Sequence, residues 1–346
     1  SRYLNPNLKM LEDRLSLIEN AESACVMASG MSAVFSSIMC QLKTGDHFIA
    51  SKVLFGSCFH IATKILPNYG IEVTLVEGTN QENWEKAFRP NTKLVFIETP
   101  ANPTNDLIDI EESKEIAKYF SSSEKEIYLA VDNTYMGPIW QHPLKHGADL
   151  VLYSATKYIG GHSDVIAGAC LGSKELMKRV KGLRTFLGNM ASPNSGWLLL
   201  RSLETLKVRM DTQAINAEKV AAFLNTHPLV EKVYYIGNLS EKDGAQFNIK
   251  NKQCLSNGGM ISFDVKGAEK DAFRFLNSLK LIKLAVSLGG TESLAEHPAT
   301  MTHVDLDPAL KNKLSITEKM VRLSIGVEFY EDIIYDIEQA LAKIDK

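Results

Sequence analysis

Short apolar runs alternate with longer helical patterns over the first two thirds of the chain, and this alternation constrains the fold more than any other feature. The candidate strands lie at residues 71–76, 94–97, 127–131, 150–153 and 169–171. Several are apolar throughout, which is typical of strands covered on both faces of a mostly parallel sheet. Between them lie helix candidates such as 110–120, with Asp109 as its N-cap. Alternating strands and helices predict an open α/β sheet.

The pattern changes after about residue 209. The elements predicted there are a long amphipathic helix, then mixed strands and helices: 203–225, 233–235, 258–265, 270–279, 321–325 and a closing helix from Glu331. This mixed order indicates a smaller α+β domain. A length of 346 residues agrees with about two domains. We therefore expect a large domain up to residue 208 and a C-terminal domain over 209–346.

Charge and hydropathy exclude two classes of protein. Lys and Arg number 38 against 41 Asp and Glu, which gives a formal net charge of −3. This balance argues against nucleic-acid binding, because phosphate contacts require a basic face. No apolar run approaches the roughly 18 residues that a membrane-spanning helix needs. We therefore expect neither nucleic acid nor membrane as a partner.

The cysteines indicate the compartment. There are five, with no C-x-x-C pair among them, which favours free thiols in a reducing environment. The cytoplasm is therefore the default expectation. The chain begins with Ser1 rather than Met, so we expect residues ahead of it, and the sequence leaves open a targeting peptide there.

Three polar side chains end or follow predicted parallel strands: Asn102, Asp132 and Lys157. Each one alone is typical of an ordinary turn, helix cap or solvated surface. Open α/β sheets, however, bind ligands just beyond the carboxyl ends of their strands. We therefore expect the three side chains to converge on one crevice.

Together these residue types match the needs of pyridoxal 5'-phosphate (PLP). A lysine beside small hydroxylated residues, here Ser154 and Thr156, can form a Schiff base with an aldehyde. A buried carboxylate can hold a pyridine nitrogen protonated, which turns the ring into an electron sink. Upstream, Gly30 precedes a predicted helix at 31–42, whose free backbone N–H groups make an anion site. Phosphate site, lysine and carboxylate are the three requirements of this cofactor.

Ordered motifs along the whole chain carry a resemblance to a known family. They are SRYLNP (1–6), ASGM (28–31), ETPANPT (98–104), VDNT (131–134), SATKYIGGHSD (154–164), SLGGTESL (287–294), HPATMTH (297–303) and VRLSIGVE (321–328). The chain resembles the Cys/Met-metabolism family of PLP enzymes, which includes cystathionine γ-synthase, cystathionine lyases, O-acylhomoserine sulfhydrylases and methionine γ-lyase. The resemblance implies the aspartate-aminotransferase-like fold (fold type I), with a mostly parallel seven-stranded sheet in the large domain and a smaller C-terminal α+β domain.

The resemblance also implies roles for the cofactor-binding residues. Lys157 would bind the cofactor covalently and carry protons, Asp132 would pair with the pyridine nitrogen, and Asn102 would hydrogen-bond the ring oxygen. The phosphate would be held by four residues: Gly30, Met31, Ser154 and Thr156. An N-terminal arm, residues 1–9, would cross a dimer interface so that Arg2 reaches a neighbouring subunit's phosphate. The tyrosine that the family places two residues before this arginine lies outside the chain.

Arg322 would clamp the substrate α-carboxylate, helped by Ser287. The residues themselves support this role, because burying an arginine within the run MVRLSI (320–325) is costly unless a carboxylate meets its fork. The alternative from strand alternation alone is an arginine on the solvated face of an edge strand.

Three departures from the family pattern bear on the reaction. Phe55 stands where the family usually has a ring-stacking tyrosine, so it keeps the stacking but lacks the hydroxyl that acts as an acid in the lyases. In this respect the chain is similar to the O-succinylhomoserine sulfhydrylases. Ser57 replaces the cysteine typical of methionine γ-lyases. Val286 replaces the glutamate of cystathionine-using γ-enzymes, which disfavours a distal ammonium group. Stretches 160–164 and 296–298 favour the γ-lyases.

We expect methionine γ-lyase-like C–S cleavage by a homo-oligomer, a dimer of dimers. The alternative is γ-replacement by a cystathionine γ-synthase or O-acylhomoserine sulfhydrylase. A PLP-binding regulatory protein without turnover is the alternative of another class, although it would not need Lys157, Asp132 and Arg322 together. No metal is expected, because the His142 and His146 pair encloses Pro143 and has no third ligand nearby.

Overall fold

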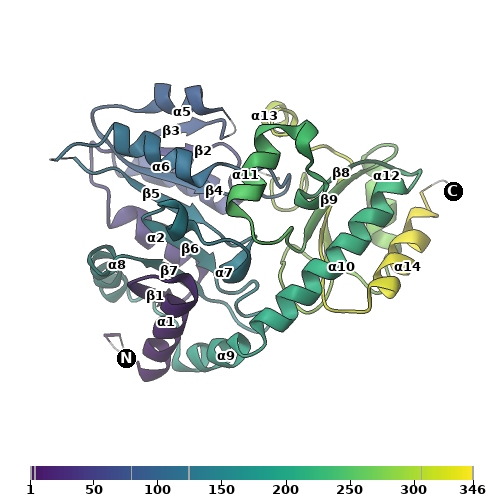
Figure 1. The fold of residues 1–346 in the computed structure, drawn as a ribbon, viewed down its shortest axis with the longest axis horizontal. Helices are drawn as coiled ribbons and strands as arrows, with labels where there is room; N and C mark the ends of the chain where they lie inside the picture. The colour runs from purple at the N-terminus through teal and green to yellow at the C-terminus, as the bar shows by residue number, and fades with distance from the viewer. Residues whose placement is uncertain (1, 4, 79, 124, 305, 345–346) are drawn as a thin grey trace.

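The computed structural model describes residues 2–3, 5–78, 80–123, 125–304 and 306–344, and these residues form two sheets (Figure 1). The strands of the larger sheet are β1 (Ser23–Met27), β2 (His47–Ser51), β3 (Glu72–Val76), β4 (Thr92–Glu98), β5 (Tyr128–Asp132), β6 (Leu150–Ser154) and β7 (Gly168–Gly172). Their order is β1-β7-β6-β5-β4-β2-β3. Strands β3, β2, β4, β5 and β6 are parallel, whereas β7 runs antiparallel to β6 and β1. The mostly parallel seven-stranded sheet is therefore confirmed.

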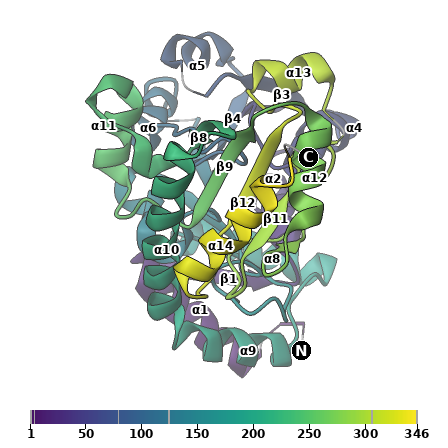
Figure 2. The ribbon, with the colours of Figure 1, turned by 90° about the vertical axis from the view of Figure 1, so that its right-hand side faces the viewer.

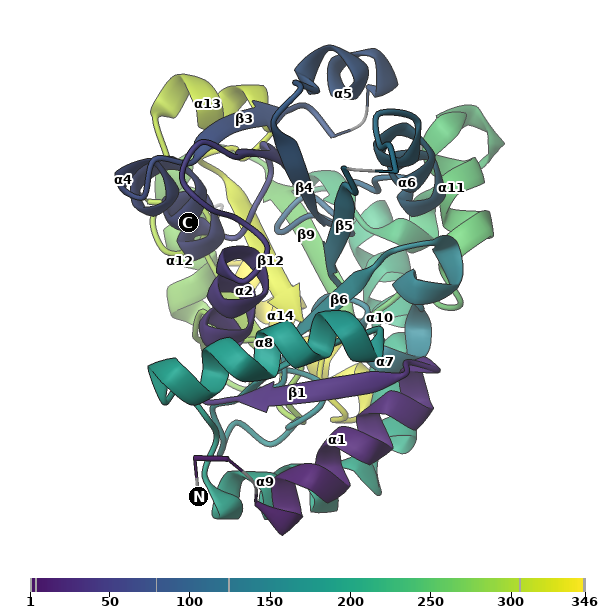
Figure 3. The same cartoon turned by 90° about the vertical axis from the view of Figure 1, so that its left-hand side faces the viewer.

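The central strands are covered on both faces, because alternate side chains enter different cores. On β4, Leu94 and Phe96 pack with α2 (Gly30–Met39) and α8 (Lys174–Leu187) on one face. Val95 and Ile97 pack with α5 (Gln81–Ala87) and α6 (Ile110–Tyr119) on the other face. Figure 3 shows α2 and α8 in front of the sheet. The remaining helices of this region are α1 (Pro6–Glu19), α3 (Gly56–His60), η1 (Ile61–Ile65), α4 (Leu66–Asn68), α7 (Gly137–Trp140), η2 (Pro143–His146) and α9 (Pro193–Leu203).

The second sheet belongs to the C-terminal part of the chain (Figure 2). Its strands are β8 (Val230–Tyr234), β9 (Met260–Val265), β10 (Lys283–Leu284), β11 (Leu294–Glu296) and β12 (Met320–Ser324), in the order β10-β11-β12-β9-β8. All neighbours are antiparallel except β10 and β11. One core of this region packs the sheet against α12 (Glu269–Ser278) and α14 (Tyr330–Leu341). The shorter helices are η3 (Ile236–Asn238), η4 (Glu241–Asp243), α11 (Ala245–Gln253) and α13 (Pro308–Lys313).

Helix α10 (Leu206–Thr226) connects the two sheets (Figures 1 and 2). Its first turns pack Leu206 and Met210 into a core with Tyr158 of the large sheet's region. Its last turns pack Val220 and Leu224 into the core of the second sheet. We propose a domain boundary near residue 208, within the first turn of this helix. The helix expected at 203–225 starts at Leu206 because Leu203 closes α9.

Two kinds of feature are absent from the residue ranges that the structure describes. Within those ranges, no helix is long and apolar enough to cross a membrane. No group of three or more His, Cys, Asp or Glu side chains in the same part of the chain is placed to hold a metal ion.

Candidate active site

A buried carboxylate, Glu98, and a half-buried one, Asp132, lie side by side where strands β4 and β5 end. Asp132 is the last residue of β5 and pairs in register with Glu98, the last residue of β4. Oδ1 of Asp132 accepts hydrogen bonds from the backbone N–H of Thr134 at 3.0 Å and from its hydroxyl at 2.6 Å. Glu98 accepts from the backbone N–H of Phe55 at 2.8 Å and from that of Asn102 at 3.3 Å. Glu98 therefore ties three predicted site segments together.

The environment disfavours two negative charges at this point. Burial raises the pKa of Asp132 above its ordinary value, although the hydrogen bonds from Thr134 oppose the shift. Burial, with the neighbouring charge of Asp132, raises the pKa of Glu98 to about 8. No ion pair among the described residues includes either carboxylate. A cation placed against Asp132 would relieve this repulsion, since an opposite charge favours the ionised form.

Helix α2 begins against the end of β6 and forms an anion cradle. A Cβ added at Gly30 would lie 2.9 Å from Cβ of Ser154, so only glycine allows this approach. The N-cap residue Ser29 accepts from the N–H of Ser32. The first backbone N–H groups of α2, including that of the half-buried Met31, lack helical partners. Thr156 is close by in the chain, but its hydroxyl bonds the backbone of Ala167 at 3.1–3.2 Å.

Lys157 lies in the turn after β6 and reaches the C-terminal domain. Its Nζ donates to Oγ of Ser287 at 3.0 Å. Burial, with Arg322 nearby, lowers the pKa of Lys157 to about 8. Gly289 lets the 287–290 segment close over this turn, because its φ is +75° and a Cβ there would lie 2.7 Å from N of Tyr158. A lysine with a depressed pKa is a competent nucleophile toward an aldehyde.

Arg322 is 2% exposed in the middle of β12, so the alternative of a solvated edge-strand arginine is wrong. Its Nη1 lies 2.6 Å from Oε1 of Glu296, the residue opposite it on β11. The same nitrogen donates to Oδ1 of Asn102 at 3.1 Å, and Nη2 donates to the carbonyls of Val286 and Ser287 at 3.0 Å. Asn102 comes from the large domain and Arg322 from the C-terminal domain, so their contact joins the two.

The other predicted residues lie at the rim or outside this cluster. Phe55 is half-buried at the start of α3, Ser57 in α3 is exposed, and the side chain of Val286 is 51% exposed. The guanidinium of Arg2 lies over the ring of Tyr3 at 5.4 Å. Among the described contacts, none joins Arg2 to the cradle at the start of α2, so its service to a neighbouring subunit stays a prediction.

Sequence reasoning missed two residues of the cluster, Glu98 and Glu296. Glu98 had a signal, because it ends an apolar strand four residues before Asn102. Glu296 had only its place in a motif. The importance of each depends on the residue that faces it across a strand pair.

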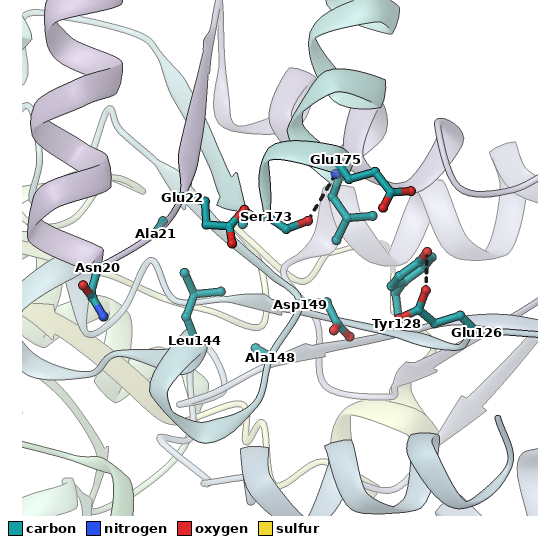
Figure 4. A pocket seen from close by; sticks show the side chains of 12 residues that line it. Asn20, Ala21, Glu22, Glu126, Tyr128, Leu144, Ala148, Asp149, Ser173 and Glu175 are labelled. Atoms are coloured by element: carbon teal, nitrogen blue, oxygen red, sulfur yellow. Dashed lines mark hydrogen bonds between the residues drawn. The ribbon is translucent and has the colours of Figure 1, made fainter. Parts of the chain in front are cut away.

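A separate pocket of about 330 Å³ is lined by acidic side chains (Figure 4). Tyr128 at its wall is the first residue of β5, whereas Asp132 is the last, so the pocket lies at the opposite edge of the sheet. Its acids are engaged locally: Glu126 accepts from the Tyr128 hydroxyl and Asp149 pairs with Lys114. This pocket is not part of the cluster around Lys157.

Comparison with known proteins decides the family. The profile of the Cys/Met metabolism PLP-dependent enzymes matches residues 1–342. The chain belongs to this family. An L-methionine gamma-lyase of Porphyromonas gingivalis is 43% identical over 343 residues, which cover 99% of this chain and 84% of that protein. An O-succinylhomoserine sulfhydrylase of Pseudomonas aeruginosa is 38% identical over 99% of this chain and 83% of its own length.

The solved structures of the family share its fold. A cystathionine gamma-lyase of Lactobacillus plantarum, complexed with L-serine, has a TM-score of 0.94 and 34% sequence identity, covering 99% of this chain and 88% of that one. The expectation of fold type I is confirmed, and so is the recognition of a Cys/Met-metabolism enzyme.

Members of the Cys/Met-metabolism family depend on PLP, and the site residues of this chain fit that cofactor. The carboxylate pair at Asp132 suits a protonated ring nitrogen, and the amine of Lys157 suits the aldehyde. The glycine-lined start of α2 suits the phosphate. Oδ1 of Asn102 is occupied by Arg322 and by the Tyr135 hydroxyl at 2.5 Å, which leaves the amide nitrogen for the ring oxygen.

Proposed function

We propose that this family member cleaves the γ C–S bond of methionine-like amino acids, an α,γ-elimination that yields 2-oxobutanoate, ammonia and a thiol. The observation that carries the proposal is similarity over nearly the whole chain. L-methionine gamma-lyases of four sources are 41–43% identical over 99–100% of this chain. Val286 supports it, because a half-exposed apolar side chain offers no charge to the distal ammonium group of cystathionine.

In this proposal the cofactor, when bound, supplies an electron sink for negative charge at the substrate Cα. Asp132 holds the proton on the ring nitrogen, and the amide nitrogen of Asn102 hydrogen-bonds the ring oxygen. The phosphate is held by Gly30, Met31, Ser154 and Thr156. Lys157 attaches the cofactor and then moves the Cα proton with its Nζ, for which an amine with a pKa of about 8 is suited. Phe55 would stack on the ring, and Ser57 and Val286 would contact the substrate.

The substrate carboxylate binds Arg322, with Ser287 beside it. Oγ of Ser287 accepts a hydrogen bond from Nζ of Lys157, and the charge of Arg322 acts on the same amine, whose pKa it helps to lower. This proximity would place the α-carbon of an amino acid near the nitrogen that takes its proton. Positioning of this kind can lower the activation barrier by several kcal/mol, and by roughly 7–11 kcal/mol in the best model reactions.

The proposal includes a homo-oligomer, a dimer of dimers, in which the arm (residues 1–9) of one subunit supplies Arg2 to another. Exposed large apolar side chains support the homo-oligomer. They lie on α1 and α9, which pack against each other, and on α8. They are Met10 (58%), Leu17 (81%), Trp197 (53%) and Phe186 (85%). Exposed apolar side chains that gather on one surface can mark an association site. Mixing Arg2→Ala and Lys157→Ala chains under subunit exchange should restore part of the activity, and no recovery despite exchange would refute a shared site.

The decisive test of substrate is a panel of methionine, cystathionine and the O-acylhomoserines. We expect 2-oxobutanoate and ammonia from methionine. A new thioether or homocysteine from an acylhomoserine would favour the second candidate, γ-replacement, for which Phe55 is the supporting observation. Absorbance of the lysine-bound cofactor that does not change with any amino acid would indicate an inert regulatory protein. We place the enzyme in the cytoplasm, in keeping with its five unpaired cysteines.

A further inference from the structure

The guanidinium of Arg322 has almost no hydrogen-bonding capacity left. Nη1 donates to Oε1 of Glu296 and to Oδ1 of Asn102. Nη2 donates to the carbonyls of Val286 and Ser287. A guanidinium carries five N–H groups, and these contacts use four of them. Nε is the nitrogen without a partner among the described residues. A second carboxylate therefore cannot make a two-bond contact without displacing one of the present partners.

Glu296 is the partner whose displacement balances the charge. The other acceptors on Arg322 are neutral, namely an amide oxygen and two carbonyls. A substrate carboxylate added beside Glu296 would place two negative charges on one buried cation, and this is unfavourable in a site with little water. Glu296 itself is 0% exposed. Its Oε1 accepts from the Thr302 hydroxyl at 3.0 Å, and its Oε2 has no partner among the described residues.

We propose that Glu296 occupies Arg322 in place of the substrate α-carboxylate, and that substrate binding replaces this ion pair and leaves Glu296 protonated. The proton comes from solvent and resides on the carboxyl group of Glu296, for which Oε2 is the open position. The net charge is zero before binding, with one guanidinium and one carboxylate, and zero afterwards, with the substrate as the carboxylate. The inference rests on the role proposed above for Arg322.

The groups around Glu296 agree with this exchange. Arg322 from β12 and Lys157 from the turn after β6 are the positive groups that face it. The Tyr135 hydroxyl faces it from the large domain and is neutral, because burial raises the pKa of Tyr135 above its ordinary value. His303 contacts Thr302 at 2.9 Å, and burial lowers the pKa of His303 to about 4, so this ring is also neutral.

Arg322 is thus the main group that keeps Glu296 ionised. Burial raises the pKa of Glu296 even beside this guanidinium, which opposes the shift. Once a substrate shares the guanidinium, burial dominates and the carboxyl group takes up a proton. The free protein then holds Glu296 ionised at a pH at which the complex holds it protonated. Affinity for a carboxylate ligand should therefore fall with rising pH, by up to about tenfold per pH unit.

The test uses the PLP-loaded enzyme and the amine-free analogue of methionine, which keeps the carboxylate and thioether but cannot react with the cofactor. Calorimetric titration in two buffers of different ionisation enthalpy counts the protons taken up on binding, at several pH values across the range in which the affinity changes. We expect about one proton per site. The absorbance of the lysine–cofactor linkage is recorded in parallel, because that linkage also titrates.

Two variants assign the proton. Glu296→Gln should lose the uptake and bind the analogue with an affinity that no longer falls with pH. Glu292→Gln is the matched control, since Glu292 lies in the same segment and bonds Ser163 rather than Arg322. It should keep the uptake. If Glu296→Gln fails to fold, the proton count and absorbance of the native enzyme still decide.

The outcomes separate this inference from the proposed function. No uptake by the native enzyme, or the same uptake in Glu296→Gln, would refute the role of Glu296. Arg322→Leu should weaken binding of the analogue in either case. Unchanged binding by Arg322→Leu would instead refute the proposed carboxylate site itself.

Discussion

The candidate site contains two pairs of ionisable side chains, and they are built in opposite ways. On the large domain, Glu98 and Asp132 bring two carboxyl groups together at the ends of β4 and β5, and Glu98 keeps its proton up to about pH 8. On the C-terminal domain, Glu296 and Arg322 bring opposite charges together across β11 and β12. The first pair has an excess of negative charge, so it is prepared for a cation. The second pair is already neutral, so it can only exchange one anion for another.

This difference indicates how each end of the site binds its ligand. A cation that joins the carboxylate pair removes repulsion, and the cofactor is therefore expected to bind tightly. A substrate that joins the arginine must remove an existing charge-assisted hydrogen bond, so the gain is only the difference between two carboxylates. If the proposed roles are correct, the large domain would retain the cofactor, and the C-terminal domain would release the carboxylate ligand after each turnover.

Loss of Lys157 should have the largest effect. Lys157→Ala removes both the attachment of the cofactor and the proton carrier, so turnover should fall by roughly 10³-fold or more. The fold should persist, as judged by thermal unfolding. Lys178→Ala, an exposed lysine of α8, is the control and should keep full activity. Near-normal turnover by Lys157→Ala would contradict the PLP assignment of this site.

The like-charged pair should make the cofactor-free protein less stable at high pH. The folded protein holds a proton on Glu98 up to about pH 8, whereas the unfolded chain releases it near 4.5. The free energy of unfolding should therefore fall between these values as pH rises, by up to ~1.4 kcal/mol per pH unit. Denaturant titrations across this range measure the slope.

Glu98→Gln should flatten this slope, because an amide does not titrate. Addition of PLP should flatten it as well, since a cation beside Asp132 relieves the repulsion. Glu175→Gln, at an exposed position of α8, should leave the slope as it is. A slope that is identical in the Glu98→Gln protein would remove the basis for contrasting the two pairs.

Asp132→Asn should retain PLP but lower turnover by about 10²-fold, because a neutral amide cannot hold a proton on the ring nitrogen. Absorbance measures the bound cofactor, and product formation measures the rate. The variant also removes the charge next to Glu98, so Glu98 should ionise more readily. Bound cofactor with an unchanged rate would show that the pair has no electrostatic part in the reaction.

Phe55→Tyr should give the smallest change. The backbone N–H of residue 55 would still donate to Glu98, so the loop keeps its tether while the ring gains a hydroxyl. If the enzyme is a γ-lyase, that hydroxyl should protonate the departing thiolate and raise 2-oxobutanoate formation by about tenfold. If it is a γ-replacement enzyme, the acyl group leaves as a carboxylate and the gain should be absent. If Phe55→Tyr and the native enzyme have the same rate with each substrate, Phe55 only stacks on the ring.

Much of the site could be predicted because strand ends and motifs are local. Asp132, Lys157 and Asn102 each follow an apolar run, and the geometry of parallel sheets then brings them together. Arg322 was recognised from the cost of burying its charge. Glu98 and Glu296 were missed because their meaning depends on register, which pairs Glu98 with Asp132 and Glu296 with Arg322.

The sheet shows the same limit. Strands β3 to β7 were visible as apolar runs, whereas β1 and β2 were not among them. His47 at the start of β2 is buried only because the hydroxyls of Thr74 and Thr92 meet its ring at 2.8 Å. Strand β1 lies at the edge beside β7, and this pairing joins segments far apart in the chain. The antiparallel direction of β7 likewise could not be predicted from the residues of the strand, because it depends on the path of the connection from β6 (residues 155–167).

Asn102 contacts both domains, so a substitution there should affect both at once. Its Oδ1 meets Arg322 from the C-terminal domain and Tyr135 from the large domain, and its backbone N–H meets Glu98. A mutation at this asparagine should therefore lower the affinity for the cofactor and for the substrate at the same time, and selection would act against both losses. The side chain of Val286, at the rim, is half exposed to solvent, so a substitution there should leave the contacts of Asn102 with the two domains unchanged. Divergence toward new substrates should accordingly accumulate at the rim, while the inner contacts resist change.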